Sequence, residues 1–350
     1  MFEKRSNTGV KIAVLSAPFP PQLGGMATVA ALLAKGFAKL GAEVKVVTRT
    51  PCPIEDSFPY EVIRRPSCGR LLQTYRWADA VLLQGLTLRL GWPLFLCRRP
   101  CLITHHMILN GGRYPGMIRR ALLKRSRNIS VSRAVAESLP VQSEVIHNPY
   151  DSETFGNGAK LQEGTGDLVF VGRLCADKGA GVLLSALSLL AGKRLRPSLT
   201  VVGEGEERSR LENEVRRHGL NGQVRFTGAV SGSPLADLLR RHRIMVVPSL
   251  CKEAFGIVAL EGIACGCVVV GSDGGGLPEA IGPCGATFPN GDARALAEVI
   301  ERLLAEPALM EKYRKSAQSH LAKHRPATVA NRYLELLRVE ASTAGGSSDL

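Results

Sequence analysis

Two glutamates eight residues apart carry the clearest chemical signal in this sequence. Glu253 and Glu261 follow an apolar run over residues 243–248 that predicts a strand. If a helix begins at Phe255 or Gly256, Glu253 lies in the loop at the positive helix N-terminus, and Glu261 lies one to two turns inside. A loop carboxylate and free backbone amides would then face one crevice. The competing interpretation is a capping acid followed by a solvated helical glutamate.

A histidine pair stands at the end of another predicted strand. Thr104-His105-His106 closes the apolar run that begins at Cys101, and ligands of open α/β sheets approach the carboxyl ends of the strands. We expect one imidazole to reach a ligand crevice and favour His106, with the choice between His105 and His106 left open. The competing interpretation is a buried imidazole that ends the strand as a satisfied core residue.

These residues need a scaffold of alternating strands and helices, and the first half of the sequence supplies one. Apolar residues run over 11–16, recur at helical spacing over 26–40, and alternate over 43–48, which predicts a βαβ unit. Further strand-like runs cover residues 80–83, 101–104, 128–131 and 144–147. Helical stretches separate them, as a parallel sheet requires, so we predict a doubly wound domain over residues 1–150.

The second half repeats this organisation after a polar stretch that ends at Asp167. Strand-like runs cover residues 168–172, 199–203, 224–227, 243–248 and 267–271, with amphipathic helices such as 180–192 and 206–218 between them. The chain is helical from 292 to 339, with breaks at Pro307 and Pro326, and is rich in Ser and Gly from 341. We predict a second α/β domain over 151–325, a helix over 326–340 and a disordered tail over 341–350.

Charge distinguishes the two halves. Residues 1–150 hold 21 Lys and Arg against 8 Asp and Glu, whereas residues 151–350 hold 24 against 23. A basic first half suits nucleic acid, anionic lipid or a phosphorylated acceptor, and net charge does not choose among them. The nine cysteines are scattered and odd in number, so we interpret them as reduced thiols and expect no metal site.

The N-terminal residues lack the apolar core and cleavage site of a secretory signal, and no window of about 18 uncharged apolar residues occurs. We therefore expect a cytoplasmic protein without a membrane-spanning helix.

Taken together, the motifs resemble glycosyltransferase family 4, the retaining glycosyl transferases of group 1, which have the GT-B fold. The run from Glu253 to Glu261 resembles the glutamate-x7-glutamate block of that family. The other motifs are Gly24-Gly25, Asn148-Pro149-Tyr150-Asp151, Gly172-Arg173-Leu174 with Lys178-Gly179, Gly203-Glu204-Gly205 and Phe226-Thr227-Gly228. The likeness covers roughly residues 10–340. It implies two Rossmann-like doubly wound parallel-sheet domains facing across a crevice, with the C-terminal helices returning to the N-terminal, acceptor-binding domain.

The resemblance also implies site residues. Glu253, His106, Arg173 and Lys178 would be catalytic. Groups that bind the nucleotide-diphosphate sugar would come from Gly24, Gly25, Gly172, Arg173, Lys178, Gly203, Gly228, Ala254, Phe255, Gly256, Ile257 and Glu261. A diphosphate brings about two to three negative charges, which cations near a helix start can neutralise. Glu261 would hold the ribose hydroxyls, and Glu253 would contact the sugar near the reacting centre. A solvated pair of cations is the competing interpretation of Arg173 and Lys178.

The implied activity is retaining transfer of a hexose-type sugar from a UDP- or GDP-sugar to a hydroxyl of a glycan or lipid-linked acceptor, in cell-surface polysaccharide, lipopolysaccharide or glycolipid biosynthesis. The nucleotide sugar is a co-substrate, and neither a metal nor another cofactor is expected, because Arg and Lys stabilise the departing charge. One alternative is a nucleotide-sugar epimerase of the same fold. Another is a non-catalytic basic binding or scaffold protein, although no nucleic-acid motif accompanies the cations and nucleic acid is not an expected partner.

A basic segment between Arg113 and Arg133 contains seven cations and no acid. Apolar residues interleave with them at helical spacing, which describes an amphipathic helix suited to an anionic membrane surface. We expect this segment to place the protein peripherally on the inner face of the cell membrane. A solvated helix whose apolar side packs on the sheet is the alternative.

Overall fold

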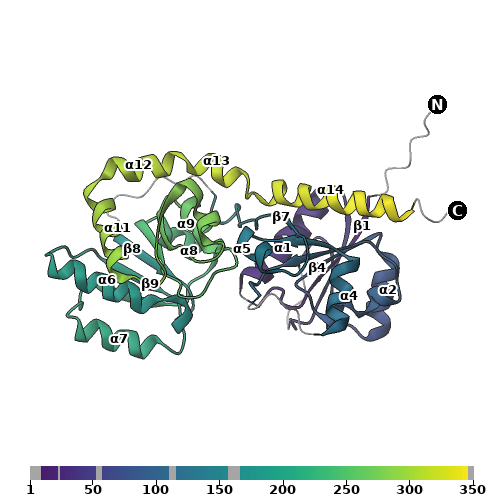
Figure 1. Ribbon diagram of the computed structural model, residues 1–350, viewed down its shortest axis with the longest axis horizontal. Helices are drawn as coiled ribbons and strands as arrows, with labels where there is room; N and C mark the ends of the chain where they lie inside the picture. Colours follow the sequence, from purple (N-terminus) through teal and green to yellow (C-terminus); the bar gives the residue numbers. More distant parts are fainter. Residues whose placement is uncertain (1–8, 23, 53–56, 110–115, 157–165, 346–350) are drawn as a thin grey trace. The chain divides into compact units, whose positions relative to one another are not determined.

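The chain folds into two compact units, each built on one parallel sheet (Figure 1). A computed structural model describes residues 9–22, 24–52, 57–109, 116–156 and 166–345. Unit 1 comprises residues 1–149 together with 326–350, and unit 2 comprises residues 150–325. Both sheets are flanked by helices, so the predicted α/β class with two Rossmann-like doubly wound domains is confirmed.

Unit 1 contains a seven-stranded parallel sheet of order β3-β2-β1-β4-β5-β6-β7. Its strands are β1 Lys11–Ser16, β2 Glu43–Thr48, β3 Glu61–Arg64, β4 Ala80–Gln84, β5 Cys101–His105, β6 Arg127–Ser130 and β7 Glu144–Val145. Its helices are α1 Gly25–Lys39, α2 Cys68–Trp77, α3 Leu88–Gly91, η1 Trp92–Phe95, α4 Met117–Arg125, α5 Arg133–Ser138 and α14 Pro326–Gly345. The central strands are continuous apolar runs because helices cover both faces of a parallel sheet.

The C-terminal helix α14 belongs to unit 1, where it packs along α1 (Figure 1, yellow). Val329, Ala330, Tyr333, Leu334 and Leu337 are buried on it. The helix continues to Gly345, so the predicted disordered tail is wrong for residues 341–345, and residues 346–350 lie outside the described part. The Ser/Gly-rich composition masked this extension, since helix propensity alone is a weak guide to where a packed helix ends.

Unit 2 contains a six-stranded parallel sheet of order β10-β9-β8-β11-β12-β13. Its strands are β8 Gly166–Val171, β9 Leu199–Val202, β10 Val224–Gly228, β11 His242–Val247, β12 Val268–Ser272 and β13 Gly285–Phe288. Its helices are η3 Ala176–Lys178, α6 Ala180–Gly192, α7 Arg208–Arg217, α8 Gly232–Leu239, α9 Ile257–Ala264, α10 Leu277–Ile281, η4 Gly282–Cys284, α11 Ala293–Ala305, α12 Pro307–Lys315 and α13 Ala317–Ala322. Pro307 and Pro326 each open a helix, as the break positions predicted.

The basic segment is not one helix. Only residues 117–125 form α4, whereas Arg127 lies in β6 and Arg133 opens α5. Arg113 lies outside the described residues. The apolar residues of α4 also divide: Leu122 and Leu123 are buried, whereas Met117 and Ile118 are 80% and 57% exposed. The prediction of one amphipathic helix over the whole segment was therefore wrong, but an exposed apolar pair remains beside the cations of α4.

Within the described residues, no helix has both the length and the apolar character needed to cross a membrane. Over the same residues, the acidic, histidine and cysteine side chains form no group of three that could ligate a metal ion. The cysteines that can be described are all free thiols, and Cys101, Cys265, Cys267 and Cys284 are buried.

The order of strands reverses once in each sheet, and these points are where side chains from different loops can converge. In unit 1 the reversal lies between β1 and β4, and in unit 2 it lies between β8 and β11. Ligands of open α/β sheets bind outside the carboxyl ends of the strands at such switch points.

Candidate functional site

A lysine, a glutamate and a serine meet at the switch point of unit 2. Lys178 ends η3 in the loop after β8, and Ser249 and Glu253 stand in the loop after β11. The Lys178 Nζ lies 2.5 Å from the Glu253 Oε1, and the Ser249 hydroxyl donates to the same oxygen at 2.7 Å. The Lys178 side chain is 31% exposed and that of Glu253 is 16% exposed. The partly exposed Lys178 ammonium can bind an anionic ligand that shares it with Glu253 or replaces that carboxylate.

Close backbone contacts hold these two loops together. Gly179 has φ +68°, and a Cβ placed on it would lie 1.8 Å from the Pro248 carbonyl oxygen, so only glycine permits this approach. The Leu250 amide donates to the Asp177 carbonyl at 2.8 Å. The Lys178–Glu253 pair therefore depends on backbone contacts on both sides of it.

The loop after β12 supports Glu253 from its other side. The Gly276 amide donates to the Glu253 carbonyl at 2.7 Å. Gly275 has φ +76°, and a Cβ there would lie 2.2 Å from the same carbonyl oxygen. The glycine run 274–276 thus serves to let this loop lie against the backbone of Glu253.

Helix α9 begins at Ile257, with Gly256 as its N-cap at φ +95°, which is one to two residues later than predicted. No side chain of the described residues caps this end, and the amides of its first turn have no partner within the helix. Phe255 is 2% exposed, and its ring lies 5.7 Å from that of His324. Phe255 therefore anchors the loop in the core, while the backbone from Ala254 to Ile257 is the part that can contact a ligand.

Glu261 lies in the second turn of α9 and is partly buried. Its carboxylate has no hydrogen-bond or ion-pair partner among the residues that the structure describes. Burial raises the pKa of this carboxyl to about 7, with a smaller contribution from the charge of Asp151. The Glu261 carboxyl can accept hydrogen bonds through both oxygens only after it has lost its proton, so ligand hydroxyls that donate to it favour the charged form.

Arg173 is not part of the lysine–glutamate pair. It follows β8 as an exposed residue without a hydrogen bond or ion pair to another described side chain. The glycines around it pack on one another: a Cβ on Gly203 would lie 1.8 Å from the Gly172 carbonyl, and the Gly203 amide donates to the Gly228 carbonyl at 2.8 Å. These three glycines therefore hold the loops after β8, β9 and β10 together.

The two histidines of unit 1 differ in their surroundings. His105 is 1% exposed, and its Nε2 lies 3.0 Å from the Asn128 Oδ1. Burial lowers its pKa, and the Asn128 hydrogen bond opposes this. His106 keeps some solvent exposure, and its Nε2 lies 2.5 Å from the Gln84 Oε1. Burial lowers the pKa of His106 to about 3, so the imidazole is neutral, with its hydrogen on the nitrogen that faces Gln84.

Sequence reasoning missed Gln84. It ends β4 with 1% exposure, and its amide nitrogen has no hydrogen-bond partner among the described residues. A buried amide group without a partner is costly. Gln84 lies 22 residues before His106 in sequence and fixes the orientation of its imidazole. The sequence offered one signal for Gln84, since it is the single polar residue at the end of an otherwise apolar strand.

Gly24 and Gly25 open α1 after β1. Gly24 is its N-cap at φ +146°. Among the residues that the structure describes, no side chain caps this end and no atom lies within 4 Å of a Cβ placed on Gly24. The Met26 sulfur would lie 3.8 Å from a Cβ on Gly85, at the end of β4. An open helix N-terminus is a suitable anion site, and Met26 occupies space next to it.

Comparisons with known proteins agree with this architecture. Residues 151–320 match the family model described as glycosyl transferases group 1. Among curated relatives, the glycogen synthase of Mycobacterium tuberculosis is 33% identical over 180 residues, which is 51% of this chain and 43% of that protein. The chain thus matches less than half the length of this relative.

Solved structures match nearly the whole chain. A glycosyltransferase from Rickettsia africae has a TM-score of 0.80 at 18% identity, covering 95% of this chain and 98% of that one. Anabaena HepE in complex with UDP and glucose has a TM-score of 0.76 at 20% identity, covering 94% and 99%. At these identities the likeness concerns the fold, which is that of GT-B glycosyltransferases.

Proposed function

We propose, from the premise that residues 151–320 belong to the glycosyl transferases group 1 family, that this chain transfers a hexose-type sugar from a UDP- or GDP-sugar to a hydroxyl of a glycan or lipid-linked acceptor. The observation that carries the proposal is the contact of Lys178 with Glu253, whose carboxylate also accepts from Ser249, at the switch point of unit 2. The UDP bound by HepE, a protein of the same fold, supports a nucleotide-diphosphate donor.

In this proposal the cations act on the leaving group. Lys178 and Arg173 bind the diphosphate and stabilise the charge that develops on it as the bond to the sugar lengthens. The open amides at the start of α9 add partial positive charge at the same edge of the sheet. Lys178 is held by Glu253 in the free chain, so the diphosphate must share or replace that partner.

The carboxylates and the imidazole act on the donor and on the transferred sugar. Glu261 accepts hydrogen bonds from the ribose hydroxyls, and Glu253 contacts the sugar next to the reacting centre. The neutral His106 supplies a hydrogen-bonding nitrogen that Gln84 orients. The acceptor hydroxyl attacks from the face that the diphosphate leaves, and the departing phosphate takes its proton, so the anomeric configuration is retained.

Donor turnover tests the proposal. The protein is incubated with a panel of UDP- and GDP-sugars and hydroxyl acceptors, and release of nucleoside diphosphate is measured together with the anomeric configuration of the product by proton NMR. Transfer with retention supports the proposal. An epimerised sugar formed without an acceptor would instead support the epimerase alternative, and the absence of any turnover across the panel would contradict both.

Donor affinity should increase with pH because of Glu261. Its pKa is about 7 in the free chain, and two hydroxyl donors favour the carboxylate, so binding releases a proton. Because binding releases a proton, the affinity for UDP rises as pH increases. If at most one proton is released, the rise is about tenfold between about pH 6 and pH 8. Calorimetric titration in buffers of different ionisation enthalpy measures the released proton.

Two variants check this linkage. Glu261→Gln should bind UDP with an affinity that no longer depends on pH in this range, and Glu261→Ala should weaken binding by about 1 to 3 kcal/mol for a lost charged hydrogen bond. An unchanged pH dependence in Glu261→Gln would remove the assignment of this residue to the ribose.

We further propose that α4 places the protein on the inner face of the cell membrane, where lipid-linked acceptors of cell-surface polysaccharide and lipopolysaccharide synthesis are found. Reversing Arg119, Arg120 and Lys124 to glutamate should abolish co-sedimentation with anionic vesicles at low salt, since each cation near the surface contributes about 1 kcal/mol. A matched reversal in unit 2, at exposed Arg216, Arg217 and Lys312, serves as the control. Equal loss in both variants would show that only net charge matters and would reject α4 as the docking element.

A further inference from the structure

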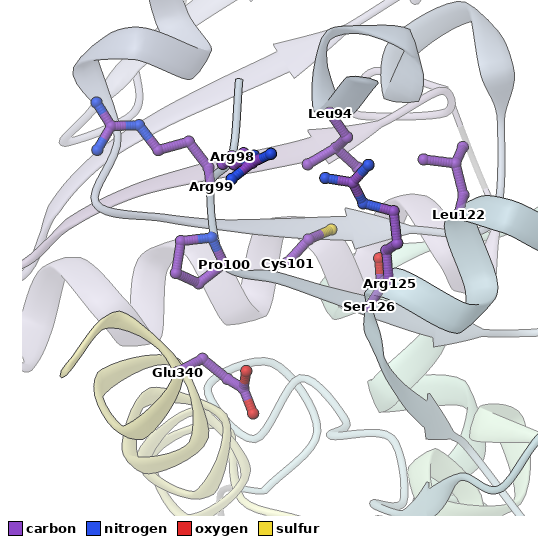
Figure 2. A pocket seen from close by; sticks show the side chains of 9 residues that line it. All are labelled: Leu94, Arg98, Arg99, Pro100, Cys101, Leu122, Arg125, Ser126 and Glu340. Carbon is purple, nitrogen blue, oxygen red and sulfur yellow. The ribbon is translucent and has the colours of Figure 1, made fainter. Parts of the chain in front are cut away.

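A pocket of about 300 Å³ opens at the amino edge of the sheet in unit 1 (Figure 2). It lies between the segment that enters β5 and the junction of α4 with β6. Its lining residues are Leu94, Arg98, Arg99, Pro100, Cys101, Leu122, Arg125, Ser126 and Glu340. Gln84 and His106 stand at the carboxyl ends of β4 and β5, so the length of β5 separates them from this pocket. The pocket is therefore no part of the candidate functional site, and its volume is at the lower end for small-molecule sites.

Two guanidinium groups reach into the pocket without a hydrogen-bond or ion-pair partner among the side chains in the described part of the chain. Arg98 and Arg125 are exposed, and neither makes a hydrogen bond or ion pair with any residue that the structure describes. Figure 2 shows both side chains extending into the space beside Leu94. The third arginine, Arg99, has a protein partner, because it donates to the Arg76 carbonyl at 2.6 Å. Its guanidinium points away from Leu94 and Arg125 in Figure 2.

The acid of the pocket does not neutralise them. Glu340 Oε1 lies 3.3 Å from the Arg127 Nη1, so its charge is already matched by a fourth arginine. The negative end of the α4 macrodipole, equivalent to roughly half a charge, favours Arg125 at this position. Half a charge leaves most of the positive charge of Arg98, Arg99 and Arg125 without compensation.

Apolar side chains form the floor of the pocket. Leu94, Cys101 and Leu122 are 6%, 4% and 1% exposed. Burial raises the pKa of the Cys101 thiol to about 12, so this wall is uncharged. A charge-assisted hydrogen bond is stronger beside apolar walls than in open water. Phe95 and Leu96, which precede Arg98, are 41% and 68% exposed and add an apolar surface next to the opening.

We propose that this pocket is a second anion site, which binds a phosphate monoester group between Arg98 and Arg125. Guanidinium groups match phosphate oxygens with paired hydrogen bonds, and a dianion balances the two unpartnered cations. The group can belong to a soluble phosphorylated metabolite or to a lipid headgroup. This assignment does not depend on the sugar-nucleotide site, since it uses none of the same residues.

The test uses the full chain and two double variants of equal charge change. Arg98→Gln with Arg125→Gln removes the pocket cations, and Arg120→Gln with Lys124→Gln removes two exposed cations from α4 outside the lining. Glycerol 3-phosphate binding is measured by NMR titration. Vesicle binding is measured with phosphatidylcholine containing phosphatidic acid, a monoester, or phosphatidylglycerol, a diester, at matched surface charge.

We expect the pocket variant to bind glycerol 3-phosphate at least about tenfold more weakly, while the α4 variant binds as the parent does. If the source is a lipid headgroup, the parent prefers phosphatidic acid over phosphatidylglycerol, the pocket variant loses that preference, and the α4 variant loses affinity for both vesicles alike. Binding of the soluble probe alone assigns the pocket to a metabolite. The proposal would be overturned if neither glycerol 3-phosphate nor phosphatidic acid bound, or if both variants lost the same affinity for glycerol 3-phosphate. Such a result would leave the proposed glycosyl transfer untouched, since donor turnover is measured separately.

Discussion

Replacing Lys178 with methionine is expected to lower kcat about 100- to 1000-fold, the usual cost of removing one preorganised group that stabilises transition-state charge. Methionine keeps most of the length and the apolar stem of lysine but removes its charge. The departing diphosphate then loses the cation that pairs with Glu253, the carboxylate to which Ser249 also donates. Initial rates of nucleoside diphosphate release at saturating donor measure the effect, and a kcat within about twofold of the parent would contradict the role of Lys178.

A second lysine of unit 2 provides a matched control. Lys193 Nζ lies 2.5 Å from Glu301 Oε2, the same separation as in the Lys178 pair. The side chains of Lys193 and Glu301, however, are both exposed to solvent. Lys193→Met should leave kcat unchanged, because an exposed ion pair contributes little. The Lys178→Met change made in a Glu253→Gln background separates the loss of the cation from the effect of leaving Glu253 without its partner.

Replacing Gly179 with alanine is expected to lower the free energy of unfolding of unit 2 by about 2 to 4 kcal/mol and to reduce kcat as well. Two costs add: alanine at φ +68° is strained, and its Cβ would lie 1.8 Å from the backbone oxygen of Pro248, which cannot move without its strand. Because Lys178 is the preceding residue, the shift also displaces its side chain from Glu253. Hydrogen–deuterium exchange of α6 peptides in increasing urea measures the stability.

The other end of α6 supplies the control. Gly192 is the last residue of the helix, and no atom of the residues described lies within 4 Å of a Cβ placed there. Gly192→Ala should stabilise the helix by up to about 1 kcal/mol, because alanine has the higher helix propensity. If Gly179→Ala behaved like Gly192→Ala, the close approach of the two loops would not constrain the site.

The central strands were predictable because burial on both faces leaves a simple signature. β1 and β2 have the predicted bounds, and their residues form continuous or alternating apolar runs. β3 and β13 were missed because each is a four-residue strand at the end of its sheet, with too few apolar residues to form a pattern. Helix α2 was also missed, because only three of its residues are buried, which are too few to form a pattern.

The candidate site was predictable as a set of loops but not as a set of contacts. Motif spacing put Lys178 and Glu253 after two predicted strands, yet their ion pair depends on the pairing of those strands and on the approach of Gly179 to Pro248, which spacing does not reveal. The pairing of His106 with Gln84 follows from the register of β4 on β5, where Gln84 lies opposite Thr104. Such partners lie far apart in sequence, so their contacts can be identified only from the folded structure.

The basic segment shows a different limit. Seven cations in a short stretch suggested one helix, whereas the six that the structure describes are divided between α4, β6 and α5. Composition averages over element boundaries, and the ion pairs of Arg127 with Glu144 and Glu340 depend on residues outside the stretch. The pocket beside Arg98 and Arg125 could not be predicted either, because residues at the end of α4 and before β5 line it together only in the folded chain.

Helix α14 gives the chain a constraint on how it can fold during translation. The surface of α1 that this helix covers includes Gly36, where a Cβ would lie 2.5 Å from that of Ala330. Almost 300 residues of synthesis separate these two positions, and the whole of unit 2 lies between them. The part of unit 1 that precedes residue 150 therefore keeps this apolar face of α1 uncovered until α14 has been synthesised, whereas unit 2 is a continuous segment that can complete its core earlier.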